Sequence, residues 1–455
     1  MGQSRDSRAW IFLFCAAVLL LSLSAAFCAD PTTLTAPEAA PSAPPEQTEQ
    51  TESPAAPQTP PPPWAGDLRT RSQLTGDWAG RRDTLAEHGM TFFGDITQYY
   101  QGVATGGRAQ RFEYGGRGDY LFDFDSTKMG LWKGGHLDLR AETRLGQDCN
   151  VIDGVISPSN FAMALPRPNQ DLTAITGLQY TQDFGERVSV FLGKLNLLDG
   201  TAAAYARGVR LDYFWNAAMQ SNLCRNYLIP SALGTGFTVR KDGEPALSFF
   251  LLDTHYTPTT SGFSTLFDNG VLLYGEYRLK TNWFDRPGHS VVGFLYSTAT
   301  RSAIDTNPYV LLNLVLSGQP IPTKNSSWTA TYRIDQVLYA DPDNPKRNWS
   351  VNCDLGLTDG NPNPIRWFVN ASLLGASPIR RRERDTIGVG YYHLGVSEVP
   401  LLTIHGFGDE NGVEVFYNAA VTPWFHITSD LQVLDPAQIR NPTTLLFGIR
   451  ARLSF

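Results

Sequence analysis

The sequence lacks long hydrophobic runs after its first few dozen residues. Beyond Trp10–Leu23, no stretch reaches the roughly 18 consecutive apolar residues that a membrane-spanning helix requires, and the mean hydropathy is −0.21. These features exclude a helical membrane protein. They are compatible with a membrane β-barrel, because only alternate residues of its strands face lipid.

Cysteine is also scarce, with five residues in 455. Cys15 and Cys28 lie in or beside the N-terminal apolar segment, which leaves Cys149, Cys224 and Cys353. Three distant cysteines exclude a disulfide scaffold. Two interpretations stay open: a Cys149–Cys224 bridge between loops, which an oxidising periplasm permits, or unpaired thiols.

Basic charge and catalytic motifs are missing as well. Charged residues make up 18% of the chain and the net charge is −7, whereas nucleic-acid-binding domains are usually basic. We find no His-Glu-x-x-His, Gly-x-Ser-x-Gly or phosphate-binding Gly-Lys-Ser/Thr motif, and the seven histidines show no metal-ligand spacing. We therefore expect no enzymatic activity, no cofactor, no metal and no nucleic-acid partner.

The N-terminal region reads as two segments that precede the folded part. Arg5 and Arg8, the apolar run Trp10–Leu23 and the small residues that follow predict a secretory signal peptide over residues 1–29. Residues 30–73 are rich in Pro, Ala, Thr and Glu, and predict a disordered periplasmic linker because they bury too little apolar surface to offset the entropy of ordering. We assign residues 74–455 to one folded domain.

A short helix is expected at the start of that domain. Asp77 is the predicted N-cap and Gly89 the stop of a helix over residues 77–88, with Trp78 and Leu85 on one face. A surface helix closing the domain is the simpler interpretation, and a barrel plug or periplasmic lid is the alternative.

From Met90 onward the hydrophobic period is two, which is typical of strands. Over 136–145, one parity holds mostly apolar residues and the other holds only ionisable ones, so a strand would point every charge to one side. The two sets are Leu137, Leu139, Ala141, Thr143 and Leu145 against His136, Asp138, Arg140, Glu142 and Arg144. Similar alternation recurs over 119–124, 328–335, 425–433 and 447–455, whereas Ala246–Leu252 is apolar on both parities.

The number of such segments favours a large barrel. About 380 residues follow the linker, and at roughly 10 residues per membrane strand plus turns and loops they fit about 16 strands. Aromatic residues near segment ends suit girdles at the two lipid interfaces. Examples are Tyr99, Tyr100, Trp283, Trp349 and Trp424.

Alternation alone does not separate a soluble sheet from a membrane barrel. The signal peptide, a strand count above the ~7–9 of a sandwich and the C-terminal Phe455 favour the barrel. Unpaired backbone groups in lipid are costly, so the last strand must pair with the first. A final strand ending in Phe455 resembles the signal that outer-membrane assembly machinery recognises. The predicted fold class is an all-β transmembrane antiparallel barrel with a short N-terminal helix.

Several motifs resemble the carbohydrate-selective porins of the OprB type. Gly76–Arg81 with Gly89-Met90 resembles the family's opening motif, and Asp125 with Leu131–Gly135 follows it. The C-terminal motifs occur in the family's order before a final strand of Gly448-Ile449-Arg450 type. They are Glu414–Tyr417, Thr422–Trp424, Asp430–Val433 and Pro436.

The resemblance covers about Leu74 to Phe455. It implies an outer-membrane porin that admits monosaccharides, and in some relatives other small polar solutes, by passive diffusion. The expected partners are outer-membrane lipid, lipopolysaccharide and the barrel-assembly machinery. Homotrimers are common among porins, but lipid and a neighbouring subunit both require apolar surface, so monomer and homotrimer both stay open. Two other functions stay open: an outer-membrane barrel enzyme of lipase or protease type, and a soluble extracytoplasmic glycan-binding β-protein.

The polar parity supplies the candidate pore-lining residues, because a barrel of this size leaves an aqueous channel. For each, the alternative is a wall charge paired with a cross-strand neighbour. They are His136, Asp138, Arg140, Glu142, Arg144, Glu414, Asp430, Gln432, Arg450 and Arg452. The basic run Arg380–Arg384 is either a solvated turn or a collar at one pore mouth that attracts anionic solutes or lipopolysaccharide phosphates.

Overall fold

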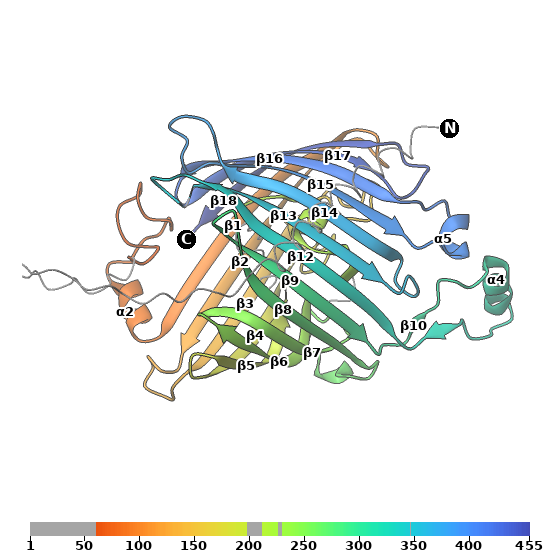
Figure 1. Ribbon diagram of the computed structural model, residues 1–455, viewed down its shortest axis with the longest axis horizontal. Coiled ribbons are helices and arrows are strands. Elements are labelled where there is room, and N and C mark those ends of the chain that lie inside the picture. Colours follow the sequence, from red (N-terminus) through yellow and green to blue (C-terminus); the bar gives the residue numbers. More distant parts are fainter. Residues whose placement is uncertain (1–60, 198–211, 226–229, 346) are drawn as a thin grey trace, which may run out of the picture. The chain divides into compact units, whose positions relative to one another are not determined.

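The computed structural model describes residues 61–197, 212–225, 230–345 and 347–455. Within these residues, sixteen antiparallel strands form one closed barrel, and a two-stranded sheet, β10–β11, stands apart from it (Figure 1). The predicted fold class and strand number are confirmed. The strands are β1 (Met90–Thr105), β2 (Phe112–Asp125), β3 (Gly135–Gly146), β4 (Leu172–Phe184), β5 (Val188–Asn196), β6 (Ser231–Lys241), β7 (Glu244–Asp253), β8 (Val271–Trp283), β9 (Arg286–Ser297), β10 (Arg301–Ser302), β11 (Thr323–Lys324), β12 (Ser327–Ala340), β13 (Asn348–Thr358), β14 (Ile365–Ala376), β15 (Thr386–Val396), β16 (Glu410–Thr422), β17 (Phe425–Asp435) and β18 (Thr444–Ser454).

The first and last strands close the barrel. β1 pairs with β18 in an antiparallel ladder in which Tyr100 faces Ile449, with one register shift between Val103 and Thr105. Beyond the ladder, Phe455 N–H donates to Gly94 O (2.8 Å) and Gly94 N–H donates to Phe455 O (3.0 Å). The expected pairing of first and last strand is therefore confirmed, and it extends to the terminal residue.

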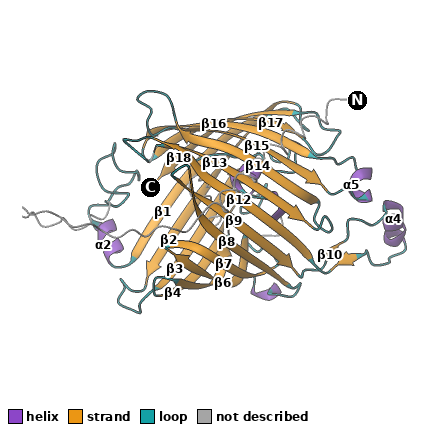
Figure 2. Cartoon of the chain, in the orientation of Figure 1, coloured by secondary structure: helices purple, strands orange, loops and turns teal. Residues whose placement is uncertain are grey.

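The connections differ in length between the two ends of the barrel. Residues 242–243 and 284–285 are two-residue turns at one end, whereas residues 147–171, 197–230 and 298–326 join strands at the other. The short-turn end carries α2 (Arg81–Glu87) and the C-terminus, and the long-loop end carries α4 (Pro308–Leu316) and α5 (Pro400–Ile404), as Figure 2 shows. In outer-membrane barrels the short turns are periplasmic. No helix among the described residues has the length and apolar character needed to cross a membrane.

Apolar side chains point outward and polar side chains inward. On β17, Leu431 and Val433 are exposed, while their neighbours Asp430 and Gln432 are buried. On β18, Phe447 and Ile449 are exposed and Arg450 is buried. This arrangement is the reverse of a soluble protein's and suits a barrel whose outer surface meets hydrocarbon.

Helix α2 is shorter than predicted. It begins at Arg81, because Trp78, Ala79 and Gly80 have φ of 54°, 58° and 82° and so lie outside the right-handed helical region. The Asp77 carboxylate nevertheless accepts hydrogen bonds from Gly80 N–H (2.8 Å) and Asp83 N–H (3.2 Å). Trp78 and Leu85 therefore do not share a helical face.

The segment from residue 61 packs on the short-turn end. Trp64 is buried, and the Arg82 guanidinium lies 4.7 Å from the Trp64 ring centroid and 4.9 Å from that of Trp78. The described structure thus starts within the range assigned to the linker. The predicted signal peptide, and the linker up to residue 60, lie outside the described residues.

Two strand features depart from simple alternation. Phe250 and Leu252 of β7 pack in an apolar cluster with Phe191, Leu272 and Leu295, which explains why Ala246–Leu252 is apolar on both parities. Tyr99 was expected in an aromatic girdle, but it is buried and its ring meets Trp215 edge-on at 5.4 Å. Its neighbour Tyr100 is exposed on the outer surface.

Candidate functional site

The ten candidate residues lie on the inner side of the barrel wall. On β3, Glu142 and Arg144 are 1% and 0% exposed, whereas Leu137 and Leu145 of the opposite parity are 38% and 39% exposed. The same contrast separates buried Glu414 from exposed Val413 and Val415 on β16. In a barrel of this width, polar side chains on the inner wall would be exposed to water. Their burial therefore means that other parts of the chain cover them.

One cover is the loop between β3 and β4, residues 147–171. Arg144 Nε donates to Met163 O (2.6 Å) and Arg117 Nη1 donates to Ala162 O (2.7 Å). From β17, which only β1 and β18 separate from β2 in the barrel wall, Gln432 Nε2 donates to Ser159 O (2.9 Å). Strands β2, β3 and β17 therefore hold this loop.

A glutamate fastens the same loop at its middle. The Glu410 carboxylate accepts hydrogen bonds from Ile156 N–H (2.6 Å), Ser157 N–H (3.0 Å) and Ala437 N–H (3.2 Å). Such charge-assisted bonds are about twice as strong as neutral ones. Glu410 thus ties the loop to β16.

The second cover is the segment 212–225, between β5 and β6. The Glu414 carboxylate accepts from Trp215 N–H (2.5 Å) and Asn216 N–H (3.0 Å). Arg450 Nη2 donates to Tyr213 O (3.0 Å), and Arg452 pairs with Asp212 at 2.9 Å. β16 and β18 therefore hold this segment, and β16 holds both covers, through Glu414 here and through Glu410 in the first loop.

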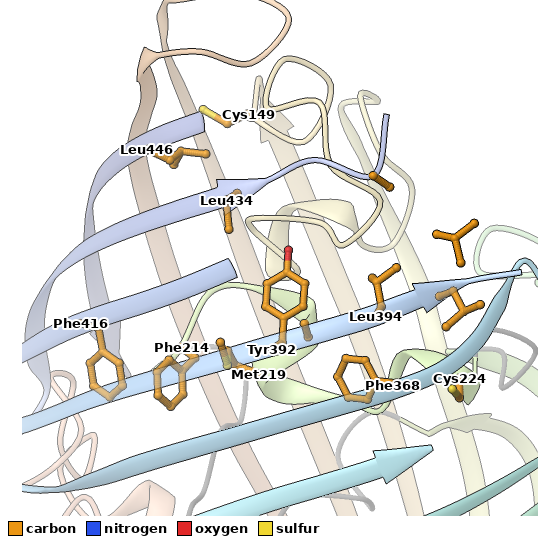
Figure 3. Packing of buried hydrophobic residues seen from close by; sticks show 14 of the residues in the cluster. Cys149, Phe214, Met219, Cys224, Phe368, Tyr392, Leu394, Phe416, Leu434 and Leu446 are labelled. Carbon is orange, nitrogen blue, oxygen red and sulfur yellow. The ribbon is translucent and has the colours of Figure 1, made fainter. Parts of the chain in front are cut away.

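The two covers also share an apolar core with the barrel wall. Phe214 and Met219 of the second segment pack with Phe368, Tyr392 and Phe416 of the wall (Figure 3). The ring centroids of Phe214 and Phe416 are 4.8 Å apart and edge-on. Apolar inward positions on β14–β18 thus receive the covers, which fill this side of the lumen.

The loop cysteines are unpaired and buried in that core. Cys149 and Cys224 are free thiols, and Cys149 Sγ donates to Gln101 O (3.1 Å). Burial raises the pKa of both thiols well above the usual range, which makes them unreactive. Of the two sequence interpretations, the structure supports unpaired thiols.

Asp153 is an acid buried within the first loop. Loss of contact with water raises the pKa of Asp153 to about 7, although Ser159 and the Val155 N–H lower it. Val155 N–H donates to Asp153 Oδ1 at 3.2 Å. The loop therefore carries a group that titrates near neutral pH.

Most candidates act as anchors in this arrangement. Seven of them contact a cover or a residue that holds one: Glu142, which pairs with Arg117 at 2.6 Å, and Arg144, Glu414, Asp430, Gln432, Arg450 and Arg452. His136 pairs with Asp183 across β3 and β4 at 3.6 Å. Pairing with a cross-strand neighbour, the expected alternative to solute contact, describes His136 and Glu142. Arg144, Glu414, Gln432, Arg450 and Arg452 instead bind the loops that cover the inner wall.

Asp138 and Arg140 line an open space instead. A cavity of about 530 Å³ lies against the wall built by β2–β8, within the range of about 300–1,000 Å³ that small-molecule pockets occupy. Its lining combines charged, hydroxyl and aromatic groups, including Lys194, Arg240, Tyr274, Glu276 and Arg278. This composition can bind a small polar solute that has some apolar surface.

Several residues of this lining are not among the candidates predicted from the sequence. In β5 the alternation breaks at Gly193, whose φ is 131°, so that Phe191 and Lys194 both reach the cavity although they differ in parity. In β8 the signal was present, since Glu276 and Arg278 alternate with Tyr277 and Leu279. That strand could have been assigned from its pattern.

Other chemistries find less support. No group of three or more His, Cys, Asp or Glu residues in the described ranges is arranged to hold a metal ion. Arg380–Arg384 lies in the turn between β14 and β15, at the short-turn end, where Arg382 pairs with Asp385 at 2.6 Å. That position favours the solvated turn over contact with lipopolysaccharide, which lies at the opposite membrane face.

Comparisons with known proteins agree with the geometry. Residues 109–455 match the family model described as "Carbohydrate-selective porin, OprB family". The high-pH structure of Pseudomonas putida OprB aligns with a TM-score of 0.73 at 18% identity, covering 85% of this chain and 99% of that one. The low-pH structure of the same protein aligns with a TM-score of 0.52 at 16% identity, with the same coverage of 85% and 99%. No curated protein sequence matches the chain.

Proposed function

Since the chain belongs to the OprB family of carbohydrate-selective porins, a family of outer-membrane channels and not of enzymes, we propose that monosaccharide-sized sugars and other small polar solutes diffuse passively through the lumen past the 530 Å³ cavity. The observation that carries this proposal is the cavity's mixed lining. Arg, Asp and Glu side chains supply partners for sugar hydroxyls, and Phe191, Phe250 and Tyr274 supply apolar faces for sugar C–H groups.

Within this proposal the candidates have two roles. Asp138 and Arg140 contact the solute, while the anchors such as Glu414 and Arg450 position the covers that narrow the lumen. His136 holds Asp183 next to the cavity. Size selection then comes from the covers, and chemical selection from the β2–β8 wall.

Glucose uptake by proteoliposomes tests the function. Purified barrels that migrate faster before boiling than after it are reconstituted, and swelling is followed in glucose and in a trisaccharide. We expect rapid swelling in glucose and little in the trisaccharide. Liposomes with boiled protein are the control, and a folded protein that admits neither sugar would contradict the proposal.

We also propose that the outer surface of the barrel contacts lipid, lipopolysaccharide and other copies of the chain. Exposed apolar residues such as Leu431, Phe447 and Ile449 would contact lipid and lipopolysaccharide acyl chains, and homotrimer formation would cover part of the same surface. Cross-linking in native membranes tests the trimer. If monomer bands alone appear under conditions that cross-link a known porin trimer, the homotrimer is excluded.

Phe455 is proposed as the recognition signal for the barrel-assembly machinery. Its ring lies 6.4 Å from that of Phe92, and its backbone pairs with Gly94. Deleting Phe455 should lower the amount of assembled barrel without changing synthesis, whereas Phe455→Tyr should assemble normally. Equal amounts of heat-modifiable barrel from all three chains would contradict this role.

The N-terminal regions are proposed as a signal peptide over 1–29 and a periplasmic linker from residue 30. N-terminal sequencing of the mature protein from the outer membrane tests the first. A mature chain that begins at Met1 would contradict it.

A further inference from the structure

Lys194 holds a third loop, residues 254–270 between β7 and β8. Its ammonium donates hydrogen bonds to the backbone carbonyls of Ile175 (2.7 Å), Thr260 (2.9 Å) and Pro258 (3.1 Å). An ammonium carries three N–H donors, so these bonds use all of them. We propose that Lys194 is a latch that holds this loop over the long-loop end of the cavity and so sets the largest solute that passes. This inference rests on the proposed porin function and names a residue that determines its size limit.

The backbone around Lys194 explains how one side chain reaches both the wall and the loop. At Gly193 φ is 131°, and a Cβ there would lie 2.2 Å from Leu178 O, so this break in β5 requires glycine. The β4–β5 ladder ends at the pair of Leu178 and Lys194. The carbonyl of Ile175, three residues nearer the long-loop end of β4, therefore has no partner in that ladder. Lys194 stands where the two strands separate and supplies the donor.

The latch depends on the charge and on the donors of the ammonium. Lys194 is only 8% exposed, and burial of an ammonium is costly unless hydrogen bonds compensate for the lost water. Bonds from a charged donor are about twice as strong as neutral ones. A glutamine side chain offers two N–H donors and a methionine none, so neither can form the same three bonds.

Two further hydrogen bonds tie the segment 254–260 of this loop to its surroundings. The Tyr256 hydroxyl donates to Pro166 O, which belongs to the first cover. Thr257 N–H donates to Ser231 O at 3.3 Å. Both bonds join neutral groups and are weaker than the charge-assisted bonds of Lys194. The segment thus continues the first cover toward β7, and Lys194 is its strong attachment to the wall.

The latch lies at the end of the cavity that a solute from outside the cell reaches first. Lys194, Asn196 and Leu197 line the cavity where β5 ends, at the long-loop end, whereas Asp138 and Pro245 line it toward the short-turn end. The short turns of outer-membrane barrels are periplasmic, so the long-loop end faces outward. Since Lys194 contacts both the cavity and the loop, the loop borders the cavity at this outer end.

Swelling of proteoliposomes in sugars tests the latch. The ratio of trisaccharide entry to glucose entry is measured for the full-length folded wild type and for Lys194→Met, which keeps the length of the side chain and removes its donors. Loss of one charge-assisted hydrogen bond raises the open fraction of the segment about tenfold, and we expect the ratio to rise by at least this factor. Lys241→Met removes an ammonium from the short-turn end of β6, outside the lining of this cavity, and should leave the ratio unchanged.

Chemical rescue separates the bonds of the ammonium from simple packing. Lys194→Ala removes a propylammonium group beyond Cβ, so added n-propylammonium fits the vacated space and can donate to the same carbonyls. It should lower the raised trisaccharide-to-glucose ratio of Lys194→Ala in a buffer without other primary amines. Tetramethylammonium carries the same charge but no N–H donor, and should leave the ratio high.

The outcomes separate the two proposals. A folded Lys194→Met barrel with the wild-type ratio overturns the latch while the porin function stands. A Lys194→Ala ratio that n-propylammonium does not lower, or that tetramethylammonium lowers equally, overturns it as well. A wild-type barrel that is folded but admits neither sugar contradicts the proposed function itself.

Tyr256→Phe decides the matter if the Lys194 variants do not fold. This variant removes the hydrogen bond to Pro166 O and frees the same segment from the first cover. A raised trisaccharide-to-glucose ratio supports a loop that limits solute size, and the wild-type ratio overturns the inference.

Discussion

Glu414 and Val415 are neighbours on β16 with opposite surroundings. Glu414 faces the lumen, where its carboxylate accepts the Trp215 and Asn216 N–H groups, and Val415 faces outward, 39% exposed. A single step along a strand thus changes the medium from a buried polar network to the outer surface. Substitutions of Glu414 and Val415 therefore compare the buried polar interior with the outer surface directly.

Replacing Glu414 by alanine should widen the pore. The change leaves two buried N–H groups without their acceptor, at about 1–3 kcal/mol each, and so loosens the segment 212–225. We expect a larger single-channel conductance and faster protease cleavage in this segment. Val415→Ala is the matched control and should match the wild type in both measurements; an unchanged conductance in Glu414→Ala would mean that Glu414 does not hold the segment.

Asp153 should make the first cover sensitive to pH. Its pKa rises from 3.8 in the unfolded chain to about 7 in the folded loop, so the folded loop binds a proton that the unfolded loop has lost between these values. Stability of the loop therefore falls as pH rises from about 4 to 7 and is lowest above pH 7.

Protease protection of the loop between pH 5 and pH 8 checks this expectation. Protection should be greater at pH 5 in the wild type, while Asp153→Asn should show the same protection at both values. A wild-type loop that is better protected at pH 8 would reverse the sign and contradict the assignment.

At the scale of elements, the segment from residue 61 through α2 acts as a clasp on the β1–β18 seam. Leu74 N–H donates to Ser454 O at 2.8 Å, and Trp424 Nε1 donates to Leu68 O at 2.8 Å. Arg82 holds the segment together from between Trp64 and Trp78, and its Nη2 donates to Phe92 O at 2.5 Å. The segment therefore stabilises the closure of the barrel from the short-turn end.

Arg82→Lys should weaken this clasp. A lysine ammonium does not provide the planar guanidinium that stacks between two rings, and the loss of stacking and of one hydrogen bond is worth about 1–3 kcal/mol. We expect the barrel to lose its fast-migrating form at a lower temperature. Arg81→Lys alters the exposed neighbour on the same helix and should leave that temperature unchanged; equal temperatures for both variants would show that the clasp does not support the seam.

On the scale of the whole molecule, the barrel wall separates lipid from an interior that the chain itself partly fills. Ile449 lies at the middle of β18 on the outer face, 42% exposed, and Arg450 lies on the inner face, 1% exposed. The covers narrow the lumen along β14–β18 and leave the cavity along β2–β8. Solute passage thus depends on the β2–β8 side of the barrel, and the packing of the covers depends on the β14–β18 side.

A charge on the outer wall should oppose membrane assembly. Ile449→Arg places a guanidinium near the middle of the hydrocarbon region, which costs about 2–4 kcal/mol. Less folded barrel should be recovered from lipid vesicles at a given urea concentration, and Ile449→Leu should fold like the wild type. Equal recovery of Ile449→Arg would place this face against something other than hydrocarbon.

The amino-acid sequence by itself determined the wall of this protein. Strand alternation is a local property, because successive side chains point to opposite faces, so 136–145 and 447–455 revealed the barrel, its approximate strand number and the side on which each candidate residue lies. The closing of β18 on β1 followed from the cost of open edges in lipid. The order of the motifs from Asp125 to Gly448-Ile449-Arg450, all within the matched residues 109–455, indicated the family.

Only the tertiary structure decided what fills the lumen. Glu414 and Trp215 are 199 residues apart in the chain, and no local period records such a contact. The same holds for Arg450 with Tyr213 and for Gln432 with Ser159, 237 and 273 residues apart. The covers, residues 147–171 and 212–225, fold back into the barrel, and most inward-facing polar candidates hold them in place. The cavity therefore lies along β2–β8, where the strand alternation is interrupted at Gly193.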